Sequence, residues 1–420
     1  MRKTYKKNIT YSVVPFGTAD QMFLVAEPAQ NFVTLPNDGT QGHGKSVPDW
    51  QRQIHSVFVD VRELLISEGF LSGVVMSNFY VADIAMKELL RQVMAEIFPE
   101  GLGAFTIIPQ APVGGGVFGA EIWAVAGKNV KHKKTNSVNI VITDSDSVRW
   151  FFGGDIRPAV LPVGAYRRSF DAFMNFSGQL IENRFQLDQV IRTWIYQGHL
   201  VLPDKVTSEV VLQRYQELNR ARTDFFGKTK FLRKYLPPEC KSTVFPASTG
   251  IGADDVDVVM AGVAVDTSRG DFIVVPLENP NQTSAFSYGE NYSPQSPKFA
   301  RGMAVTMGNW CQIFVSGTAS ITDSESRFSG NPELQTEQTL DNIAALIDGS
   351  NLARHGINGF DSGMDKLECA RVYVKNPDDF AVIDTVCKKR LGNVPTLYTI
   401  ADVCRPELLV EIEGFAVTVK

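Results

Sequence analysis

CRPELLVEIEG, residues 404–414, continues as FAVTVK to residue 420 and predicts a buried β-strand, because residues 408–417 are apolar apart from Glu411, Glu413 and Gly414. Strand side chains alternate between faces, so Glu411 and Glu413 share one face. Buried carboxylates are unfavourable unless they are paired or hydrogen-bonded. Three interpretations stay open: an edge strand with a solvated face, carboxylates satisfied at a subunit seam, or a carboxyl that acts as an acid or base.

Composition indicates a globular protein of two to three domains. The chain has 420 residues, of which 44% are hydrophobic and 21% are charged, and its net charge is −5. An acidic balance argues against nucleic acid as a partner. No run of eighteen apolar residues occurs, so no membrane span is expected. The apolar run at residues 11–16 is too short for a secretory segment. These features favour a cytoplasmic protein.

Cysteine and histidine patterns give little support to metal or cofactor chemistry. The five cysteines are scattered without CxxC spacing, and the five histidines form no paired ligand pattern. Free thiols in a reducing compartment are therefore expected, with no metal and no cofactor. Cys404 has no histidine near it in the sequence, so a packing role is its default.

Periodicity predicts an α+β (α/β layered) fold whose helices cover one face of a mixed sheet. Helices are expected at residues 54–68, 83–97, 170–180, 208–225, 335–347 and 380–391. Strands are expected at residues 105–109, 121–127, 138–143, 256–265, 272–277, 303–307, 312–316 and 367–375. The helix at 208–225 carries Tyr215, Asn219 and Arg222 on one face.

Two further segments have more than one interpretation. TGIGA at residues 249–253 lacks the spacing of a nucleotide loop, so a tight turn is favoured. Residues 278–301 form a long segment rich in proline and aromatic residues, including Phe286, Tyr288 and Tyr292. Such a loop is either packed on the surface or functional. Phenols and an arginine beside a buried carboxylate would suit a small anionic cyclic ligand.

The last 110 or so residues contain the motifs VSGTA (315–319), QTEQTLDNI (335–343), ARVYVKNPDDF (370–380) and VEIE (410–413). In order and spacing these motifs resemble the YjgF/RidA superfamily. A more specific set comprises FPASTGIGA (245–253), ENP (278–280), PKFAR (297–301), NLARHG (351–356) and DVCR (402–405). This set resembles the chorismatases, which cleave the enolpyruvyl ether of chorismate. This resemblance implies two RidA-like domains, at residues 1–240 and 246–420, arranged as a pseudo-oligomer.

The resemblance also implies the chemistry and the site. An enol ether is cleaved after protonation of its methylene carbon, and Glu411 occupies the position of the family's catalytic acid. The residues implied to bind chorismate are Arg222, Tyr215, Tyr288, Tyr292 and Arg301. Members that form 3-hydroxybenzoate resemble this chain in having glycine at Gly317 and cysteine at Cys404, where those that form a dihydroxycyclohexadiene carboxylate have alanines. The expected products are therefore pyruvate and 3-hydroxybenzoate.

Alternatives to this function are a chorismate hydrolase that forms the diol, a RidA-type imine or enamine hydrolase, and a non-catalytic binding protein on the same fold. Deaminating RidA proteins carry an arginine just after the proline of the loop before the final strand. Here that loop is VPTL, residues 394–397, and it has no arginine. Both Glu411 and the tyrosine loop are present, which disfavours a non-catalytic role. A monomer or a small homo-oligomer is expected.

Overall fold

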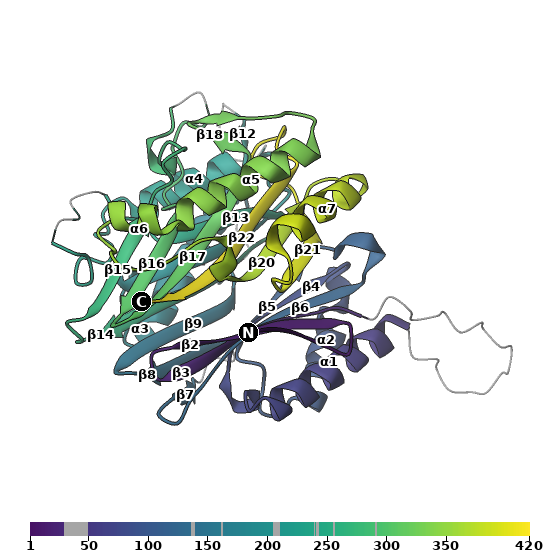
Figure 1. The fold of residues 1–420 in the computed structure, drawn as a ribbon. Coiled ribbons are helices and arrows are strands. Elements are labelled where there is room, and N and C mark those ends of the chain that lie inside the picture. Colours follow the sequence, from purple (N-terminus) through teal and green to yellow (C-terminus); the bar gives the residue numbers. More distant parts are fainter. Residues whose placement is uncertain are drawn as a thin grey trace, which may run out of the picture.

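The computed structural model describes residues 1–28, 49–135, 139–160, 163–204, 211–238, 240, 243–254, 257–289 and 292–420. Within these ranges the chain forms three six-stranded mixed sheets, each with its own helices (Figure 1). We call residues 2–126, 131–267 and 272–419 the first, second and third units. Every unit has the same sheet order: its six strands, numbered along the unit, lie side by side as 1-2-3-6-4-5.

The first unit has the sheet order β1-β2-β3-β6-β4-β5. Its elements are β1 (Arg2–Tyr5), β2 (Ile9–Phe16), β3 (Ala19–Ala26), α1 (Asp49–Ser67), β4 (Val74–Val81), α2 (Lys87–Ile97), β5 (Ala104–Pro109) and β6 (Phe118–Ala126).

The second unit has the sheet order β7-β8-β9-β14-β10-β13. Its elements are β7 (Lys131–Lys134), β8 (Ile140–Ser145), β9 (Val148–Ile156), α3 (Ala165–Glu182), β10 (Val190–Gly198), β11 (Pro203–Asp204), β12 (Leu212–Gln213), α4 (Arg214–Phe226), β13 (Ala247–Ala253) and β14 (Val258–Thr267). The short strands β11 and β12 pair only with each other.

The third unit has the sheet order β15-β16-β17-β22-β20-β21. Its elements are β15 (Phe272–Leu277), β16 (Gly302–Met307), β17 (Trp310–Ala319), β18 (Ile321–Thr322), β19 (Glu325–Ser326), α5 (Pro332–Ile347), α6 (Gly349–Arg354), β20 (Leu367–Val374), α7 (Phe380–Leu391), β21 (Thr396–Ile400) and β22 (Val410–Val419).

The layered class with mixed sheets is confirmed, but the sheet pairing divides the chain differently from the expected boundary at residues 240–246. That boundary passes through the second sheet, because β13 pairs with β10, and β14 pairs with both β10 and β9. The second unit, residues 131–267, was not expected as a separate unit. The segment at 249–253 is also corrected, since it lies in β13 and not in a tight turn. A Cβ at Gly252 would lie 2.9 Å from the Asp402 backbone, so glycine here permits close approach of another segment.

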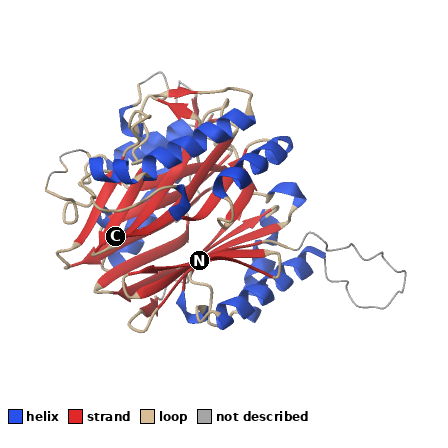
Figure 2. Ribbon diagram, in the orientation of Figure 1, coloured by secondary structure: helices blue, strands red, loops and turns tan. Residues whose placement is uncertain are grey.

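The inner faces of the three sheets share one aromatic core. The Trp123 ring of β6 lies 5.1 Å from Phe152 of β9 and 5.3 Å from Phe415 of β22. Trp194 of β10 lies 6.2 Å from Phe415. Separate apolar clusters join the first sheet to α1 and α2 and the third sheet to α5 and α7. The helices therefore lie outside and the sheets inside, as a pseudo-oligomer within one chain (Figure 2).

Three tyrosines at equivalent positions lie close together at the junction of the units. Tyr80, Tyr196 and Tyr373 are each the seventh residue of their strands, β4, β10 and β20. The hydroxyls of Tyr80 and Tyr196 are 3.4 Å apart, and Arg371 donates to Tyr196 at 3.0 Å and to Tyr373 at 2.9 Å. The three strands thus place the same side chain at the shared centre.

A buried ionic network runs through this junction. Arg371 of β20 forms ion pairs with Glu121 of β6 and with Glu413 of β22, and Glu413 is also paired with Arg192 of β10. Two guanidinium groups therefore face two carboxylates, drawn from all three units. Removing one member of such a network leaves an uncompensated buried charge.

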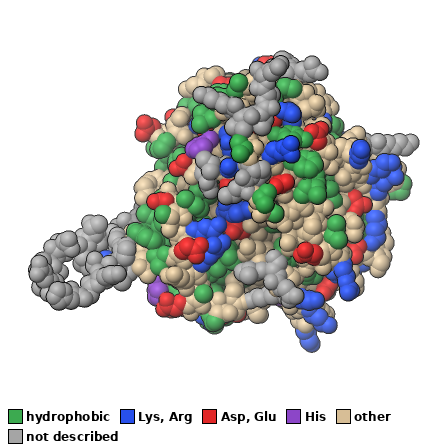
Figure 3. All heavy atoms as spheres, turned by 180° about the vertical axis from the view of Figure 1, so that it is seen from behind, with side chains coloured by type: hydrophobic (Ala, Val, Ile, Leu, Met, Phe, Trp, Pro, Cys, Tyr) green, Lys and Arg blue, Asp and Glu red, His purple; other side chains and the backbone are tan. Residues whose placement is uncertain are grey.

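Acidic and basic side chains are interspersed over the described part of the face in Figure 3. None of the helices in the described ranges combines the length and apolar character needed to cross a bilayer.

Arg371→Met should destabilise the fold by about 3–5 kcal/mol, because it leaves Glu121 and Glu413 with fewer cationic partners in the interior. Urea unfolding followed by circular dichroism measures the change. Arg354→Met, on the exposed surface of α6, is the matched control and should change stability by no more than about 0.5 kcal/mol. A loss as small as that of the control would contradict a structural role for the network.

Candidate active site

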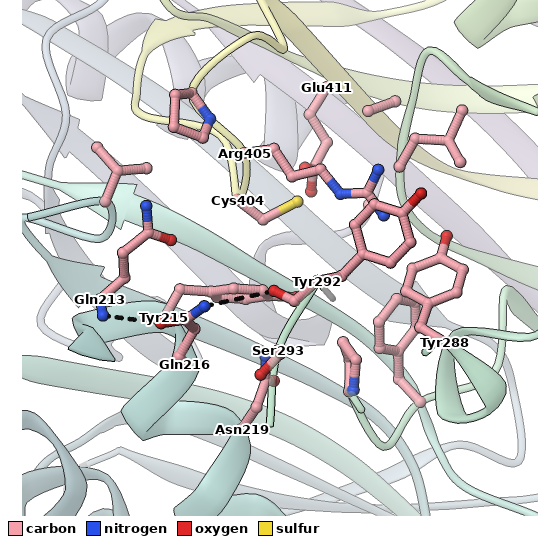
Figure 4. A pocket seen from close by; sticks show the side chains of 18 of the residues that line it. Gln213, Tyr215, Gln216, Asn219, Tyr288, Tyr292, Ser293, Cys404, Arg405 and Glu411 are labelled. Atoms are coloured by element: carbon pink, nitrogen blue, oxygen red, sulfur yellow. Dashed lines mark hydrogen bonds between the residues drawn. The ribbon is translucent and has the colours of Figure 1, made fainter. Parts of the chain in front are cut away.

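A cavity of about 720 Å³ lies where the second unit meets the third. Its walls come from α4 and β13 of the second unit, and from β17, β22, Tyr288, residues 292–301 and residues 404–407 of the third (Figure 4). Seven of the eight residues singled out from the sequence line it: Glu411, Cys404, Gly317, Tyr215, Tyr288, Tyr292 and Arg301. The eighth, Arg222, lies behind the wall.

Glu411 is a buried carboxyl on a central strand. β22 lies between β17 and β20, where Glu411 is the register partner of Ala319 and Tyr373, and its exposed fraction is 4%. The edge-strand interpretation is therefore wrong. Burial and then the nearby charge of Glu413 raise the pKa of Glu411 to about 8, although Arg301 and Arg192 oppose the shift. Glu411 is thus mostly protonated at neutral pH, and no described side chain is hydrogen-bonded to it.

Only the third unit carries an acid at this strand position. The register partner of Tyr373 is Glu411, whereas the equivalent tyrosines Tyr80 and Tyr196 face Gly119 and Val259. The three quasi-equivalent strands β6, β14 and β22 therefore differ at the residue that would supply a proton.

Glu413 has the opposite electrostatic environment to Glu411, although both side chains share a strand face. Burial would raise its pKa, but Arg371 and Arg192 more than compensate, so the pKa of Glu413 lies below its usual range. Three further donors contact the carboxylate: Trp194 Nε1 at 3.1 Å, Tyr373 OH at 3.0 Å, and Thr249 Oγ1. Glu413 is therefore an ionised structural group satisfied at a seam between units, while Glu411 remains available as an acid.

Gly317 leaves the space that the Glu411 carboxyl occupies. The pairing of β17 with β22 is interrupted by a bulge between Val315 and Thr318, which contains Gly317. The Gly317 N–H donates to Thr249 Oγ1 at 2.9 Å, which fixes the bulge. A Cβ at Gly317 would overlap Oε1 of Glu411 and lie 3.0 Å from Cγ2 of Thr249. Alanine here would therefore displace the flexible end of Glu411.

Cys404 lines the same cavity as Glu411 (Figure 4). Burial and the charge of Glu411 raise the pKa of the Cys404 thiol to about 12, against the opposing influence of Arg405 and Arg301. The group is a thiol at neutral pH and is not an activated nucleophile. Its contribution is to the shape of the cavity wall.

The second unit contributes one face of α4. Tyr215 and Asn219 line the cavity, and Nη2 of Arg222 donates to Oδ1 of Asn219 at 3.2 Å. Arg222 is 1% exposed, and its Nε and Nη1 have no hydrogen-bond acceptor among the described residues. Burial raises the pKa of Tyr215 and lowers that of Arg222. A buried guanidinium with two unused donors is a candidate anion site.

The described parts of the loop at 278–301, residues 278–289 and 292–301, pack against the third sheet and form the opposite wall. Arg301 is 3% exposed and donates through Nη2 to the Thr283 carbonyl at 3.0 Å and to the Tyr288 hydroxyl. The Tyr288 and Tyr292 rings are 5.8 Å apart, and the Tyr292 hydroxyl donates to Glu325. Both tyrosines are thereby held at the cavity.

Sequence reasoning missed Arg405, which also lines the cavity. Its guanidinium carbon is 4.1 Å from the Tyr292 ring centre and 5.3 Å from that of Tyr288. The signal was present, since Arg405 follows Cys404 in the DVCR motif, but that pattern alone does not show which way the side chain points. Within the described residues, no group of three or more histidine, cysteine or acidic side chains could hold a metal ion.

The comparisons with known proteins identify the class. No family model matches the chain. The 3-hydroxybenzoate synthase of Streptomyces hygroscopicus is 30% identical over 300 residues, covering 70% of this chain and 80% of the relative. The chorismatase of Streptomyces rapamycinicus is 34% identical over 173 residues, covering 40% of this chain and 50% of the relative. A crystal structure of a chorismatase at 1.08 Å resolution has a TM-score of 0.62 at 21% identity, covering 82% of this chain and 93% of that one.

The fold and cavity define a chain of three mixed-sheet units with a buried carboxylic acid in a cavity between the second and third. The chain belongs to the chorismatase family. The family expected from the sequence is thereby confirmed, and the solved chorismatase shows the same fold.

Glu411 should titrate with a pKa near 8. Difference infrared spectroscopy of the protein should show a protonated-carboxyl carbonyl band that persists through neutral pH and disappears as the pH rises past that value. Glu411→Gln should remove the band, whereas Glu407→Gln should retain it. A band lost below pH 6 would contradict the environment described for Glu411.

Proposed function

We propose that this chain cleaves the enolpyruvyl ether of chorismate to pyruvate and 3-hydroxybenzoate, with Glu411 as the general acid. The observation that carries this proposal is the buried, protonated Glu411 in a cavity of about 720 Å³, the size class of small-molecule sites. The name of the relative that the chain matches over 80% of its length supports the aromatic product.

The chemistry of an enol ether accounts for the need for such an acid. Protonation of the methylene carbon forms a bond from carbon to the Glu411 proton and leaves an oxocarbenium ion on the ether carbon. Glu411 becomes a carboxylate in this step, and Arg301, which favours that charged form, stabilises it. A pKa close to the working pH is suited to general acid catalysis. Glu413 cannot serve, because its carboxylate is ionised and fully engaged.

Two buried arginines, whose guanidinium groups both lie near the Phe299 ring, provide cations for a dianionic substrate. Arg222, behind Asn219, has two unused donors, and Arg301 lies beside the tyrosine loop. Chorismate carries one carboxylate on the ring and another on the enolpyruvyl group, so it needs cationic partners at two places. We assign Tyr215, Tyr288 and Tyr292 to packing against the ring and to hydrogen bonding with its polar groups.

Glu411→Gln should lower kcat for pyruvate release from chorismate by roughly 10²–10⁴-fold, because the amide cannot donate a proton to carbon. A coupled pyruvate assay measures the rate, and thermal unfolding should show that the variant stays folded. In the wild type, kcat should be highest at low and neutral pH and fall as pH rises through about 8, since the acid is active only while protonated. Full activity in Glu411→Gln would exclude this residue as the acid.

Product choice should depend on Gly317 and Cys404. Pyruvate and 3-hydroxybenzoate together account for every atom of chorismate, whereas pyruvate and the dihydroxycyclohexadiene carboxylate require one added water. A Cβ at Gly317 would shift the Glu411 carboxyl. Alanine in place of Cys404 would remove the sulfur atom from the cavity wall and so enlarge the cavity. Both changes alter the pose of the ring relative to the proton donor and to water.

Gly317→Ala combined with Cys404→Ala should move the product ratio from 3-hydroxybenzoate towards the diol, as measured by chromatography with mass detection. Each single variant should shift it less. Gly178→Ala is the control, because a Cβ there would contact nothing within 4 Å. An unchanged ratio in the double variant would show that these two positions do not select the product.

A further inference from the structure

Arg405 is hydrogen-bonded to the protein through one of its two terminal guanidinium nitrogens. Its Nη1 donates to the Ser324 carbonyl at 2.9 Å and to Ser326 Oγ at 3.0 Å. Its Nη2 is buried and has no hydrogen-bond partner among the described residues. A guanidinium fixed at one nitrogen, with the other nitrogen free, presents donors in a defined direction.

No acidic side chain in the described ranges neutralises Arg405. None comes within the 4.0 Å that defines an ion pair. The nearby Glu407 accepts a hydrogen bond from Ser326 at 2.6 Å, and Glu325 accepts one from the Tyr292 hydroxyl. A partly buried cation without an acidic partner at a cavity wall is suited to bind an anion.

Two tyrosine rings restrict where that anion can lie. The Arg405 guanidinium packs over Tyr292 at 4.1 Å and also contacts Tyr288 at 5.3 Å, both measured to ring centres. Figure 4 shows the Arg405 side chain extending towards Tyr292, with Asn219 on the other side of the cavity. Because Arg222 is hydrogen-bonded to Asn219 from behind, Arg222 and Arg405 lie on opposite sides of the cavity.

The position of Glu411 decides which carboxylate belongs to which end. In the enolpyruvyl group the carboxylate and the methylene are bonded to the same carbon, so a methylene within reach of Glu411 brings that carboxylate close by. The guanidinium carbons of Arg405 and Arg301 both lie near the Tyr288 ring, at 5.3 and 5.4 Å from its centre, and both arginines line the cavity together with Glu411. Arg222 does not line the cavity and lies behind Asn219. The end occupied by Arg405 is therefore the enolpyruvyl end.

We propose that Arg405 binds the carboxylate of the enolpyruvyl side chain, together with Arg301, while Arg222 binds the ring carboxylate. This assignment rests on the proposed function and deepens it. It makes Arg405 a residue that selects dianionic ether substrates over monoanionic aromatic acids. Tyr292 holds the guanidinium plane in place, so the direction of its free N–H groups is set before the ligand arrives.

Three stable ligands test each end without requiring turnover. 3-(Carboxymethoxy)benzoate carries both carboxylates in the arrangement of the substrate, phenoxyacetate keeps only the side-chain carboxylate, and 3-methoxybenzoate keeps only the ring carboxylate. Isothermal titration calorimetry on the full-length protein measures their affinities for the wild type, Arg405→Met, Arg222→Met and the surface control Arg354→Met.

Arg405→Met should weaken binding of 3-(carboxymethoxy)benzoate and phenoxyacetate by on the order of 10- to 100-fold and leave 3-methoxybenzoate within about twofold. Arg222→Met should give the reverse pattern, and the control should change nothing. Arg405→Lys keeps the charge but loses the planar fork, so it should weaken the side-chain ligands less than Arg405→Met does.

Equal weakening of all three ligands by Arg405→Met, or no weakening of phenoxyacetate, would overturn the assignment, as would failure of the wild type to bind the dicarboxylate. The ligand pattern is independent of turnover. If the protein shows this pattern but releases no pyruvate from chorismate, the Arg405 assignment stands and the proposed reaction is wrong. If the protein releases pyruvate but does not show the pattern, the proposed reaction stands and the Arg405 assignment is wrong.

Discussion

The buried ionic network of Arg371, Glu413, Arg192 and Glu121 is the interaction on which the rest of the structure depends. It draws one group each from the first and second sheets and two from the third, at the place where their inner faces meet. Charges of this kind are stable in an interior only when each has its partners in place. The network therefore fixes how the three units are placed against one another, and the cavity between the second and third units depends on that placement.

The same network separates the behaviour of two carboxyls that are two residues apart. Glu413 is ionised by its guanidinium partners, and its negative charge then helps to raise the pKa of Glu411. Two titratable groups with opposing environments are typical of acid catalysis. The equivalent strands of the other units place Gly119 and Val259 where the third unit has Glu411, so only one of three similar strands offers the acid.

The local patterns allowed prediction of the layered class, most helices of all three units and the strand that carries Glu411. The second unit and its boundaries could not be predicted, because β10 is buried along its whole length and lacks a period, and because β13 contains the glycines that were interpreted as a turn. Arg192, which pairs with Glu413, and Glu121, which pairs with Arg371, come from strands distant in the sequence. Residue spacing around Glu413 therefore does not predict this network. For Arg405, the DVCR motif shows only that an arginine follows Cys404. The folded structure shows that this arginine lines the cavity.

The most direct test of this account is the reaction of the purified protein with chorismate, with pyruvate measured by a coupled assay and the ring product identified by chromatography with mass detection. The account predicts equal amounts of pyruvate and 3-hydroxybenzoate. Pyruvate with a dihydroxycyclohexadiene carboxylate would contradict the product assignment and retain the ether cleavage. Absence of pyruvate would contradict the central claim that the buried Glu411 serves to protonate an enolpyruvyl ether.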